Sequence, residues 1–270
     1  MRGSDVLEVN DLVVRYGHGP RAVHAVDGVS LTVPRGGVVG VVGESGSGKS
    51  TLARAIVGMA PVHSGTIAVD DEDMTRRSRA GARTRASMVQ MVFQDPYSSL
   101  NPRMRVGEAI AEVLAVHSDV PASARAEGVR ELLELVHLDP DVARQHPRQI
   151  SGGMRQRVAI ARVLAVRPRL IVADEITSAL DASVQGVVLN LLRELQTELG
   201  LSMLFISHNL AAVRYMAQEV VVMHRGKVVE HGLTQQVVGT PQHPYTQGLI
   251  SALPRIEDAG RDVLLGSASR

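Results

Sequence analysis

The sequence predicts an α/β fold built on a mostly parallel, twisted sheet, and three observations support that class. Short apolar segments alternate with segments of helical period, which is the order of parallel strands joined by helices. A glycine-rich loop at residues 43–50 separates an apolar strand from a helix. Between residues 106 and 164 the apolar residues keep helical spacing, so we also expect a separate, mostly helical lobe.

Strands are expected where an apolar segment is bounded by glycine, proline or charged residues. In the first of them apolar residues loosely alternate with polar ones, and a glycine-rich loop at residues 16–20 follows it. The expected strands are 7–14, 25–33, 38–42, 66–69, 88–93, 170–173 and 203–206, followed by a closing hairpin of 220–224 and 227–232.

Helices are expected from apolar spacing and from residues typical of helix ends. Ser151 and Asp181 are good N-cap residues, and Gly200 is typical of a helix C-terminus. Outside the helical lobe, helices are expected from residue 52 onward, over 154–166 and 182–199, and as a short amphipathic segment between 243 and 254.

Composition excludes several classes of protein. Apolar residues make up 44% of the 270 residues and aromatic residues 2%, so the core must be aliphatic. A formal net charge of +1 argues against a general nucleic-acid binder. The absence of cysteine excludes disulfides and thiolate metal sites and suits a reducing compartment. Without a signal peptide or a membrane span, we expect a soluble intracellular chain that reaches a membrane only through a partner.

Two charged runs are interpreted as solvated surface. Residues 70–73 are all acidic, but they lack the spacing of a calcium-binding loop, so a turn is expected there. The basic run is Arg76-Arg77-Ser78-Arg79, followed by Arg83 and Arg85. It could contact nucleic acid or lipid headgroups, but a solvated face is the more common role of such a run.

The loop at residues 43–50 fits the phosphate-binding pattern G-x-x-x-x-G-K-[ST] at every fixed position. Its sequence is Gly43-Glu44-Ser45-Gly46-Ser47-Gly48-Lys49-Ser50, followed by Thr51. Glycines let successive backbone N–H groups converge on phosphate oxygens, and the following helix N-terminus adds positive charge. Lys49 is expected to reach the β- and γ-phosphates and Ser50 to coordinate Mg²⁺. An ordinary Gly/Ser turn is the alternative, which the strand before it and the helix after it disfavour.

Acidic and basic side chains follow two of the expected buried strands. Asp174 and Glu175 end the strand 170–173, and His208 follows the strand 203–206. In α/β folds ligands bind at the carboxyl ends of strands. One carboxylate can hold Mg²⁺ through water, and the next can orient or deprotonate an attacking water. A lone histidine is usually structural, but this position at a strand end favours a role in the site.

Two further features remain ambiguous when each is considered alone. Two glycines follow Ser151 at the start of a helix, where each costs about 1 kcal/mol relative to alanine. They fit a helix N-terminus that a phosphate approaches closely, although an ordinary loop-to-helix junction is the simpler interpretation. Tyr16, one of four tyrosines, is either a ligand contact or a half-buried loop aromatic.

Together these motifs resemble the ATP-binding subunit of ABC transporters, over about residues 5 to 240. The motifs are the loop at 43–51, Phe93-Gln94-Asp95-Pro96, Ile150-Ser151-Gly152-Gly153-Met154-Arg155-Gln156-Arg157, Leu170-Ile171-Val172-Ala173-Asp174-Glu175, Ser178-Ala179-Leu180-Asp181 and Ser207-His208. Residues 95–102 and the tail from His243-Pro244-Tyr245-Thr246 to Leu253-Pro254 resemble the oligopeptide/dipeptide/nickel importer branch of that family.

The resemblance implies a P-loop NTPase (RecA-like) core with an antiparallel β subdomain and an inserted α-helical subdomain. The ATP-binding domain would span residues 1–240, with the core at 1–95 and 165–235 and the helical subdomain at 96–164. Residues 241–270 would form a tail of the peptide-importer type. The cofactors implied are ATP and Mg²⁺.

The resemblance also implies a role for each motif residue. Tyr16 would stack on adenine, and the residues from Gly43 to Thr51 would hold the phosphates. Ser50 and Gln94 would ligate Mg²⁺, with Asp174 acting through water. Glu175 would be the general base, and His208 would contact the γ-phosphate, so the catalytic set is Glu175, His208, Gln94 and Lys49. Ser151, Gly152, Gly153 and Met154 would serve the nucleotide on a second subunit, with Asp181 near that interface.

The implied protein is the ATP-hydrolysing subunit of an importer at the cytoplasmic face of the membrane. Its partners would be a second ABC ATPase (the same or a similar chain), two transmembrane permease subunits and, indirectly, a solute-binding protein, with no nucleic acid. The solute would be a small molecule such as a di- or oligopeptide. Two alternatives are a soluble ABC-type ATPase switch in a non-transport complex and an ATP-binding regulatory module without turnover.

Three residues depart from the family pattern. Met154 stands where glutamine is common, although methionine also occurs there in this branch. Ile176 follows Glu175 where proline is usual, so a less rigid loop is expected. Asn209 replaces the usual aspartate after His208, with no evident consequence from sequence.

Overall fold

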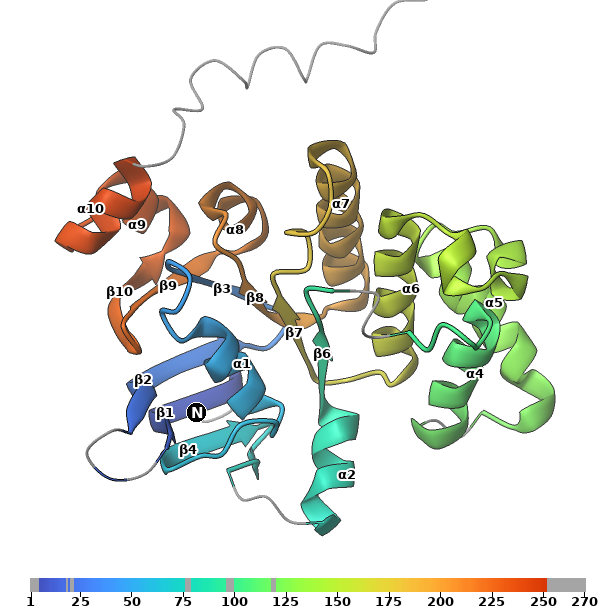
Figure 1. Cartoon of the computed structure of the whole chain (residues 1–270), viewed down its shortest axis with the longest axis horizontal. Helices are drawn as coiled ribbons and strands as arrows, with labels where there is room; N and C mark the ends of the chain where they lie inside the picture. The colour runs from blue at the N-terminus through green and yellow to red at the C-terminus, as the bar shows by residue number, and fades with distance from the viewer. Residues whose placement is uncertain are drawn as a thin grey trace, which may run out of the picture.

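The computed structural model describes residues 5–17, 19, 22–75, 79–95, 100–117 and 120–251 (Figure 1). Its strands are β1 (Asp5–Tyr16), β2 (Val23–Pro34), β3 (Val38–Val42), β4 (Ser64–Val69), β5 (Glu72–Asp73), β6 (Val89–Val92), β7 (Leu170–Asp174), β8 (Ser202–Ile206), β9 (Glu219–His224) and β10 (Lys227–Leu233). Its helices are α1 (Lys49–Ile56), α2 (Arg79–Met88), α4 (Val106–His117), α5 (Arg125–Leu135), α6 (Gly152–Ala165), α7 (Ala182–Leu199), α8 (Leu210–Met216), α9 (Thr234–Gly239) and α10 (Pro244–Ser251).

The strands form two separate sheets. A six-stranded sheet has the order β10-β9-β3-β8-β7-β6, and every neighbouring pair in it is parallel except β10 with β9. A four-stranded antiparallel sheet has the order β2-β1-β4-β5. The mostly parallel sheet predicted from the sequence pattern and the antiparallel β subdomain implied by the family resemblance are both confirmed.

Strand β3 lies at the centre of the larger sheet and contributes to two hydrophobic cores. Val39 and Val41 pack with α1 and the antiparallel sheet, whereas Val38 and Val42 pack with the helices on the other face. Alternation along a strand sends successive side chains to opposite faces, so one apolar strand serves both cores. Gly40 is required by packing, because a Cβ there would lie 2.3 Å from Val213 Cγ1 of α8.

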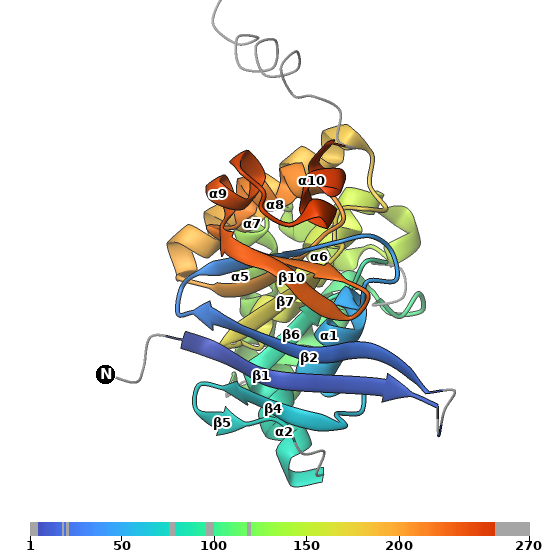
Figure 2. The same ribbon diagram turned by 90° about the vertical axis from the view of Figure 1, so that its left-hand side faces the viewer.

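Helices and the antiparallel sheet cover the two faces of the central sheet. Helix α1 contacts β1, β2 and β7, and thus lies between the two sheets. Figure 2 shows the antiparallel sheet as a layer below the central sheet, with α7, α8, α9 and α10 above it. The carboxyl ends of β3, β7 and β8, where ligands bind in such folds, are followed by loops from both halves of the chain.

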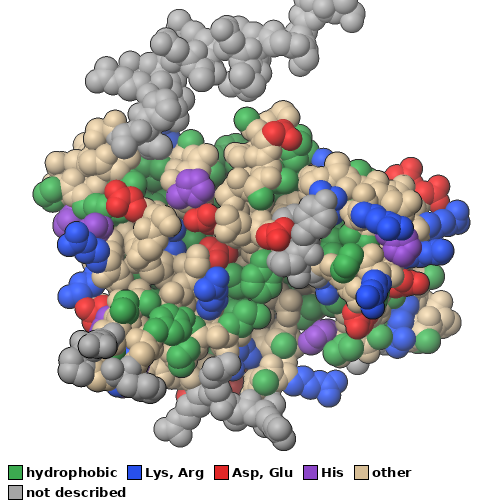
Figure 3. Space-filling model, viewed as in Figure 1, with side chains coloured by type: hydrophobic (Ala, Val, Ile, Leu, Met, Phe, Trp, Pro, Cys, Tyr) green, Lys and Arg blue, Asp and Glu red, His purple; other side chains and the backbone are tan. Residues whose placement is uncertain are grey.

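Helices α4, α5 and α6 pack on one another and form the expected helical lobe. Their shared core includes Ile110, Leu133 and Val158, all fully buried. Helix α6 also contacts β6 and α7, which joins the lobe to the central sheet. On the face seen in Figure 3, charged side chains of both signs are interspersed, as the small net charge implies.

Three helices were not predicted from the sequence: α2, α8 and α9. Helix α2 is rich in arginine and contains Gly81, and the other two are only 7 and 6 residues long, so none shows a clear apolar period. The solvated-face interpretation is wrong for Arg85, which is 6% exposed and donates a hydrogen bond to Met74 O. Residues 76–78 of that run lie outside the described part of the chain.

Asp70 lies in the expected turn and also forms ion pairs with two arginines. Its carboxylate forms ion pairs with Arg35 and with Arg169, which lies 3.3 Å away. The Arg35 hydrogen bond lowers the pKa of Asp70. The turn at residues 70–71 has positive φ at both aspartates, and the short strand β5 follows it. Asp70 therefore ties the antiparallel sheet to the chain around β7.

Candidate functional site

The loop between β3 and α1 needs its glycines because neighbouring backbone approaches it closely. Gly43 has φ 153° and Gly48 φ 105°, in the region that favours glycine. A Cβ on Gly43 would lie 2.2 Å from Met223 O, and one on Gly48 would lie 2.2 Å from Ala25 O. Residues 44–46 form an exposed apex, followed by buried Ser47 and Lys49. The loop thus curls around an opening lined by backbone amides.

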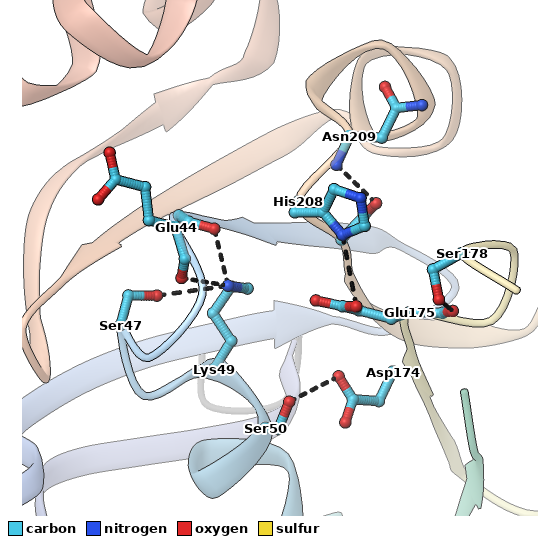
Figure 4. Close-up of polar contacts among 11 residues, drawn as sticks. Glu44, Ser47, Lys49, Ser50, Asp174, Glu175, Ser178, His208 and Asn209 are labelled. Atoms are coloured by element: carbon cyan, nitrogen blue, oxygen red, sulfur yellow. Dashed lines mark hydrogen bonds and ion pairs between the residues drawn. The ribbon is translucent and has the colours of Figure 1, made fainter. Parts of the chain in front are cut away.

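Lys49 is the first residue of α1, and its ammonium points back into the loop. The side chain is 3% exposed, and Nζ donates to Gly43 O at 2.7 Å and Glu44 O at 2.8 Å (Figure 4). Burial lowers the pKa of Lys49, and the carboxylates of Glu175 and Asp174 only partly oppose that shift. A buried ammonium at the start of a helix, held by loop carbonyls, is suited to bind phosphate.

Asp174 ends strand β7 directly opposite the start of α1. Ser50 Oγ donates to Asp174 Oδ1 at 3.2 Å. Burial raises the pKa of Asp174, although the Ser50 hydrogen bond and the nearby Arg54 and Lys49 oppose the shift. A buried carboxylate beside a hydroxyl fits Mg²⁺, which accepts one or two protein oxygens and takes its other ligands from phosphates and water. The described residues contain no cluster of three His, Asp or Glu side chains that would form an all-protein metal site.

Glu175 follows β7 in a backbone conformation that is rare for a non-glycine residue. Its φ is 49°, and its N–H donates to Ile206 O of β8 at 2.9 Å. Ser178 fixes the other side, since its N–H and its hydroxyl both donate to Glu175 O. His208 Nδ1 lies 3.4 Å from Glu175 Oε2. Strained backbone held by several hydrogen bonds is common where a side chain must be aimed, here toward the opening of the loop (Figure 4).

The structure explains two departures from the family pattern. Asn209 is the N-cap of α8, because its Oδ1 accepts hydrogen bonds from Ala211 N at 3.0 Å and Ala212 N at 3.3 Å. Aspartate and asparagine are about equally good at that position. Ile176 is 1% exposed and belongs to the larger hydrophobic core. The loop after Glu175 is therefore anchored by burial in place of proline.

The structure brings most of the expected catalytic and phosphate-binding residues into one cluster. Lys49 and Ser50 lie at the start of α1, whereas Asp174, Glu175 and His208 lie at the ends of the neighbouring strands β7 and β8 (Figure 4). Gln94 is exposed just after β6, which pairs with β7, and so lies at the same edge of the sheet.

Tyr16 lies outside this cluster, on the antiparallel sheet. It ends β1, pairs with Val23 and is 42% exposed. The side chain of Tyr16 is therefore accessible for stacking on a ligand.

The residues expected to serve a second subunit lie apart from the phosphate loop. Ser151 caps α6 by accepting a hydrogen bond from Met154 N at 3.2 Å, and Asp181 caps α7 through Val184 N at 2.9 Å. Figure 1 shows α6 on the opposite side of β6 and β7 from α1. Gly152 has room for a Cβ, whereas a Cβ on Gly153 would lie 2.5 Å from Val184 Cγ1. Close packing on α7, and not only ligand approach, therefore requires the second glycine.

Tyr245 contacts the phosphate loop, and the sequence analysis did not place it at the site. Its hydroxyl accepts a hydrogen bond from Glu44 N at 2.9 Å, across 201 positions of sequence. The sequence offered only its place in the tail motif 243–246, because no local pattern reports a contact between such distant segments.

Two family models match the chain. The model described as ABC transporter matches residues 26–178, and the model described as oligopeptide/dipeptide transporter, C-terminal region, matches residues 229–268. The first covers more than half of the chain and includes the phosphate loop, Gln94 and the carboxylates after β7.

Similar proteins cover nearly the whole chain. A putative peptide import ATP-binding protein of Brucella abortus is 45% identical over 268 residues, 98% of this chain and 80% of that protein. The oligopeptide transport ATP-binding protein OppF of Lactococcus lactis is 44% identical, over 94% of this chain and 82% of that protein.

Solved structures of ATP-binding cassettes have the same fold. CbiO1 from Clostridium perfringens, described as part of the ABC transporter complex cbiONQ, is 28% identical with a TM-score of 0.78, covering 94% of this chain and 98% of that one. The dimeric, post-hydrolysis cassette MJ0796 bound to ADP and Pi is 27% identical with a TM-score of 0.76, covering 84% and 98%. A chain that shares almost its full length with these relatives, and folds as the solved cassettes do, belongs to the ABC transporter family, among its ATP-hydrolysing subunits.

Proposed function

We propose that this chain hydrolyses ATP to power the import of peptides through a membrane permease. The observation that carries the peptide assignment is the C-terminal match at residues 229–268, because the phosphate loop and the carboxylates are common to the whole family. The names of the relatives from Brucella abortus and Lactococcus lactis support the same substrate class. The non-transport switch is the weaker candidate, since nothing in that alternative accounts for this tail.

The loop between β3 and α1 would bind the phosphates of ATP. The backbone amides at the start of α1 and the ammonium of Lys49 would supply positive charge and hydrogen-bond donors to the phosphates. Tyr16 is accessible for stacking on adenine. Because the groups are fixed by α1 and by neighbouring backbone, the site is arranged before nucleotide arrives.

Ser50, Gln94 and Asp174 would hold Mg²⁺, which offsets phosphate charge when bound. Glu175 would accept a proton from the attacking water, and its strained backbone aims the carboxylate at the space in front of the loop. His208, 3.4 Å from Glu175, would contact the γ-phosphate and hold the carboxylate in place. The positions of Asp174, Glu175 and His208 at the ends of β7 and β8, opposite Ser50 at the start of α1, support these roles.

A second ATPase chain would complete the site. The capped N-terminus of α6 is exposed at Ser151, lies apart from its own phosphate loop and fits the nucleotide of a partner subunit. Closure of the two chains on ATP would drive two permease subunits at the cytoplasmic face of the membrane, with a binding protein delivering the peptide. Among the described residues no helix is both long and apolar enough to cross a membrane.

Co-purification from native membranes tests this proposal. The tagged chain is expected to bring down two multi-span permeases and an ATPase, either the same chain or a similar one. Recovery of soluble partners alone would move the assignment to the non-transport switch. The family resemblance also implies that the helical lobe and the loop after Gln94 receive a short cytoplasmic helix of a permease, and residues 96–99 of that loop lie outside the described part of the chain.

A further inference from the structure

The tail motif at residues 243–246 reaches the phosphate loop directly. Tyr245 lies in α10, and its hydroxyl accepts the backbone N–H of Glu44, the first residue of the exposed apex, at 2.9 Å. The resemblance to the importer branch rests partly on this motif, but it assigns Tyr245 no role at the site. This hydrogen bond joins the tail to the loop proposed to bind nucleotide phosphates, so we consider what it contributes to that loop.

The β9–β10 turn and α10 hold the loop from two positions. Gly226 N, in that turn, donates to Ser47 O at 2.9 Å. His224, at the end of β9, lies against the Tyr245 ring with centroids 4.0 Å apart. The loop is thus fixed at Ser47 by the turn and at Glu44 by the tyrosine, and the same hairpin supports both contacts.

The tail is anchored so that the tyrosine hydroxyl has a defined place. The carboxylate of Glu230, on β10, accepts hydrogen bonds from Gln242 N at 2.8 Å and His243 N at 3.1 Å, just before α10. Burial would raise the pKa of Glu230, but these backbone hydrogen bonds and the Thr246 hydroxyl outweigh it and lower that pKa. An ionised carboxylate at this helix start is also favoured by the helix dipole.

Each residue of the motif has a structural task in that anchor. His243 Nδ1 accepts from Tyr245 N at 3.1 Å, and Pro244 occupies the first helical position, where proline is favoured. Thr246 is 1% exposed, and Tyr245 and Leu249 of the same helix pack against the larger core. The contacts of the motif therefore place the Tyr245 hydroxyl at the backbone N–H of Glu44.

We propose that Tyr245 is a positioning residue of the nucleotide site, which holds the apex of the phosphate loop in its binding conformation through the Glu44 amide. This inference rests on the proposed binding of nucleotide phosphates by residues 43–51. An apex ordered before binding loses less conformational entropy when phosphate arrives, so the hydroxyl strengthens nucleotide binding without touching the nucleotide.

Equilibrium binding of MgADP, which places phosphate in the loop without turnover, tests the proposal in the full-length chain. The variant Tyr245→Phe keeps the ring against His224 and removes only the hydroxyl. Its matched control is Tyr215→Phe, which removes a hydroxyl that donates to Asn190 Oδ1 at 2.6 Å on the surface of α8 and α7. Thermal unfolding of each variant is recorded alongside, and binding is measured well below every unfolding midpoint.

The Kd for MgADP is expected to rise about threefold to tenfold in Tyr245→Phe, the effect of losing one neutral hydrogen bond. In Tyr215→Phe it should stay within about twofold of wild type. A Kd for Tyr245→Phe that matches the control overturns the inference, whether or not its unfolding midpoint has fallen, because the contact would then be structural only. A wild-type chain that does not bind MgADP would instead overturn the assigned phosphate site itself.

Discussion

The carboxyl group of Asp174 is ionised at a cost to the folded protein. Its pKa is raised by burial above the ordinary value of 3.8, so the charged form is less stable in the folded chain than in the unfolded one. That cost is absent below the ordinary pKa and is fully present above the raised one. A carboxylate that lowers the stability of the folded chain is consistent with the proposed role of Asp174 at the Mg²⁺ site, since functional sites commonly cost stability.

We predict that Asp174→Asn stabilises the nucleotide-free protein at neutral pH. The neutral amide keeps the shape and relieves the buried charge, and each kcal/mol gained raises Tm by about 2–4 °C in a protein of this size. The gain should shrink as pH falls toward 3.8, where the wild-type carboxyl is itself neutral. Thermal unfolding of both proteins across this pH range measures it. An unchanged or lower Tm at neutral pH would contradict the assigned cost.

Lys49→Ala is predicted to weaken MgADP binding by at least about tenfold, because a charge-assisted contact to phosphate is lost. The control is Lys227→Ala, which breaks an exposed ion pair with Asp27 at 3.2 Å and should leave the Kd within about twofold. Isothermal titration of the three proteins gives the comparison. Equal affinities for Lys49→Ala and wild type would remove Lys49 from the phosphate site.

Single residues show where prediction from sequence succeeded and where it could not. The clustering of Lys49, Ser50, Asp174 and Glu175 was predictable, because strand ends of a parallel sheet meet at one edge. The capping role of Asn209 was accessible in principle, since asparagine before a helix is a known signal, but α8 was too short to be recognised.

Helices α6 and α7 meet at a contact that tolerates no side chain on Gly153. A Cβ there would lie 2.5 Å from Val184 Cγ1, and valine is stiff at χ1, so the neighbour cannot move aside cheaply. The helical lobe is joined to the central sheet partly through α6 and α7. The second glycine of the motif thus has a packing role besides any ligand role.

We predict that Gly153→Ala lowers the free energy of unfolding by about 1–3 kcal/mol, the usual cost of overpacking. Gly186→Ala is the control on α7, where a Cβ meets nothing within 4 Å. Alanine should be favourable there by up to about 1 kcal/mol, its advantage over glycine in a helix. Urea unfolding of both variants tests the pair. A stabilised Gly153→Ala would show that α6 and α7 adjust freely at this contact.

Elements with a strong apolar period were predicted well from local pattern, whereas the separate antiparallel sheet was predicted only through the family resemblance. Strand β3, with its five apolar or glycine positions, and α7, with Asp181 at one end and Gly200 at the other, have the expected bounds. The assignment of β1, β2 and β4 to a separate antiparallel sheet depends on which strands pair, and local alternation does not contain that information.

The molecule as a whole combines contacts that are distant in sequence. The phosphate loop is contacted by the β9–β10 turn and by α10, more than 170 residues away, and the proposed ATP site combines α1 with strand ends from the second half of the chain. Motifs predicted the chemical groups of the site because their types and spacing are local. The contact of Tyr245 with Glu44 could not be predicted, because it arises only when the hairpin folds back on β3.

Peptide uptake by cells that carry Glu175→Gln in place of the wild-type chain tests the proposed power source most directly. The amide keeps the shape of Glu175 but cannot accept the proton of the attacking water, so turnover should fall by about 10²–10⁴-fold. We predict that the variant still assembles with its membrane partners and binds MgADP, while uptake of labelled peptides is lost. Uptake at a near wild-type rate would contradict the assignment of Glu175 as the base that drives import.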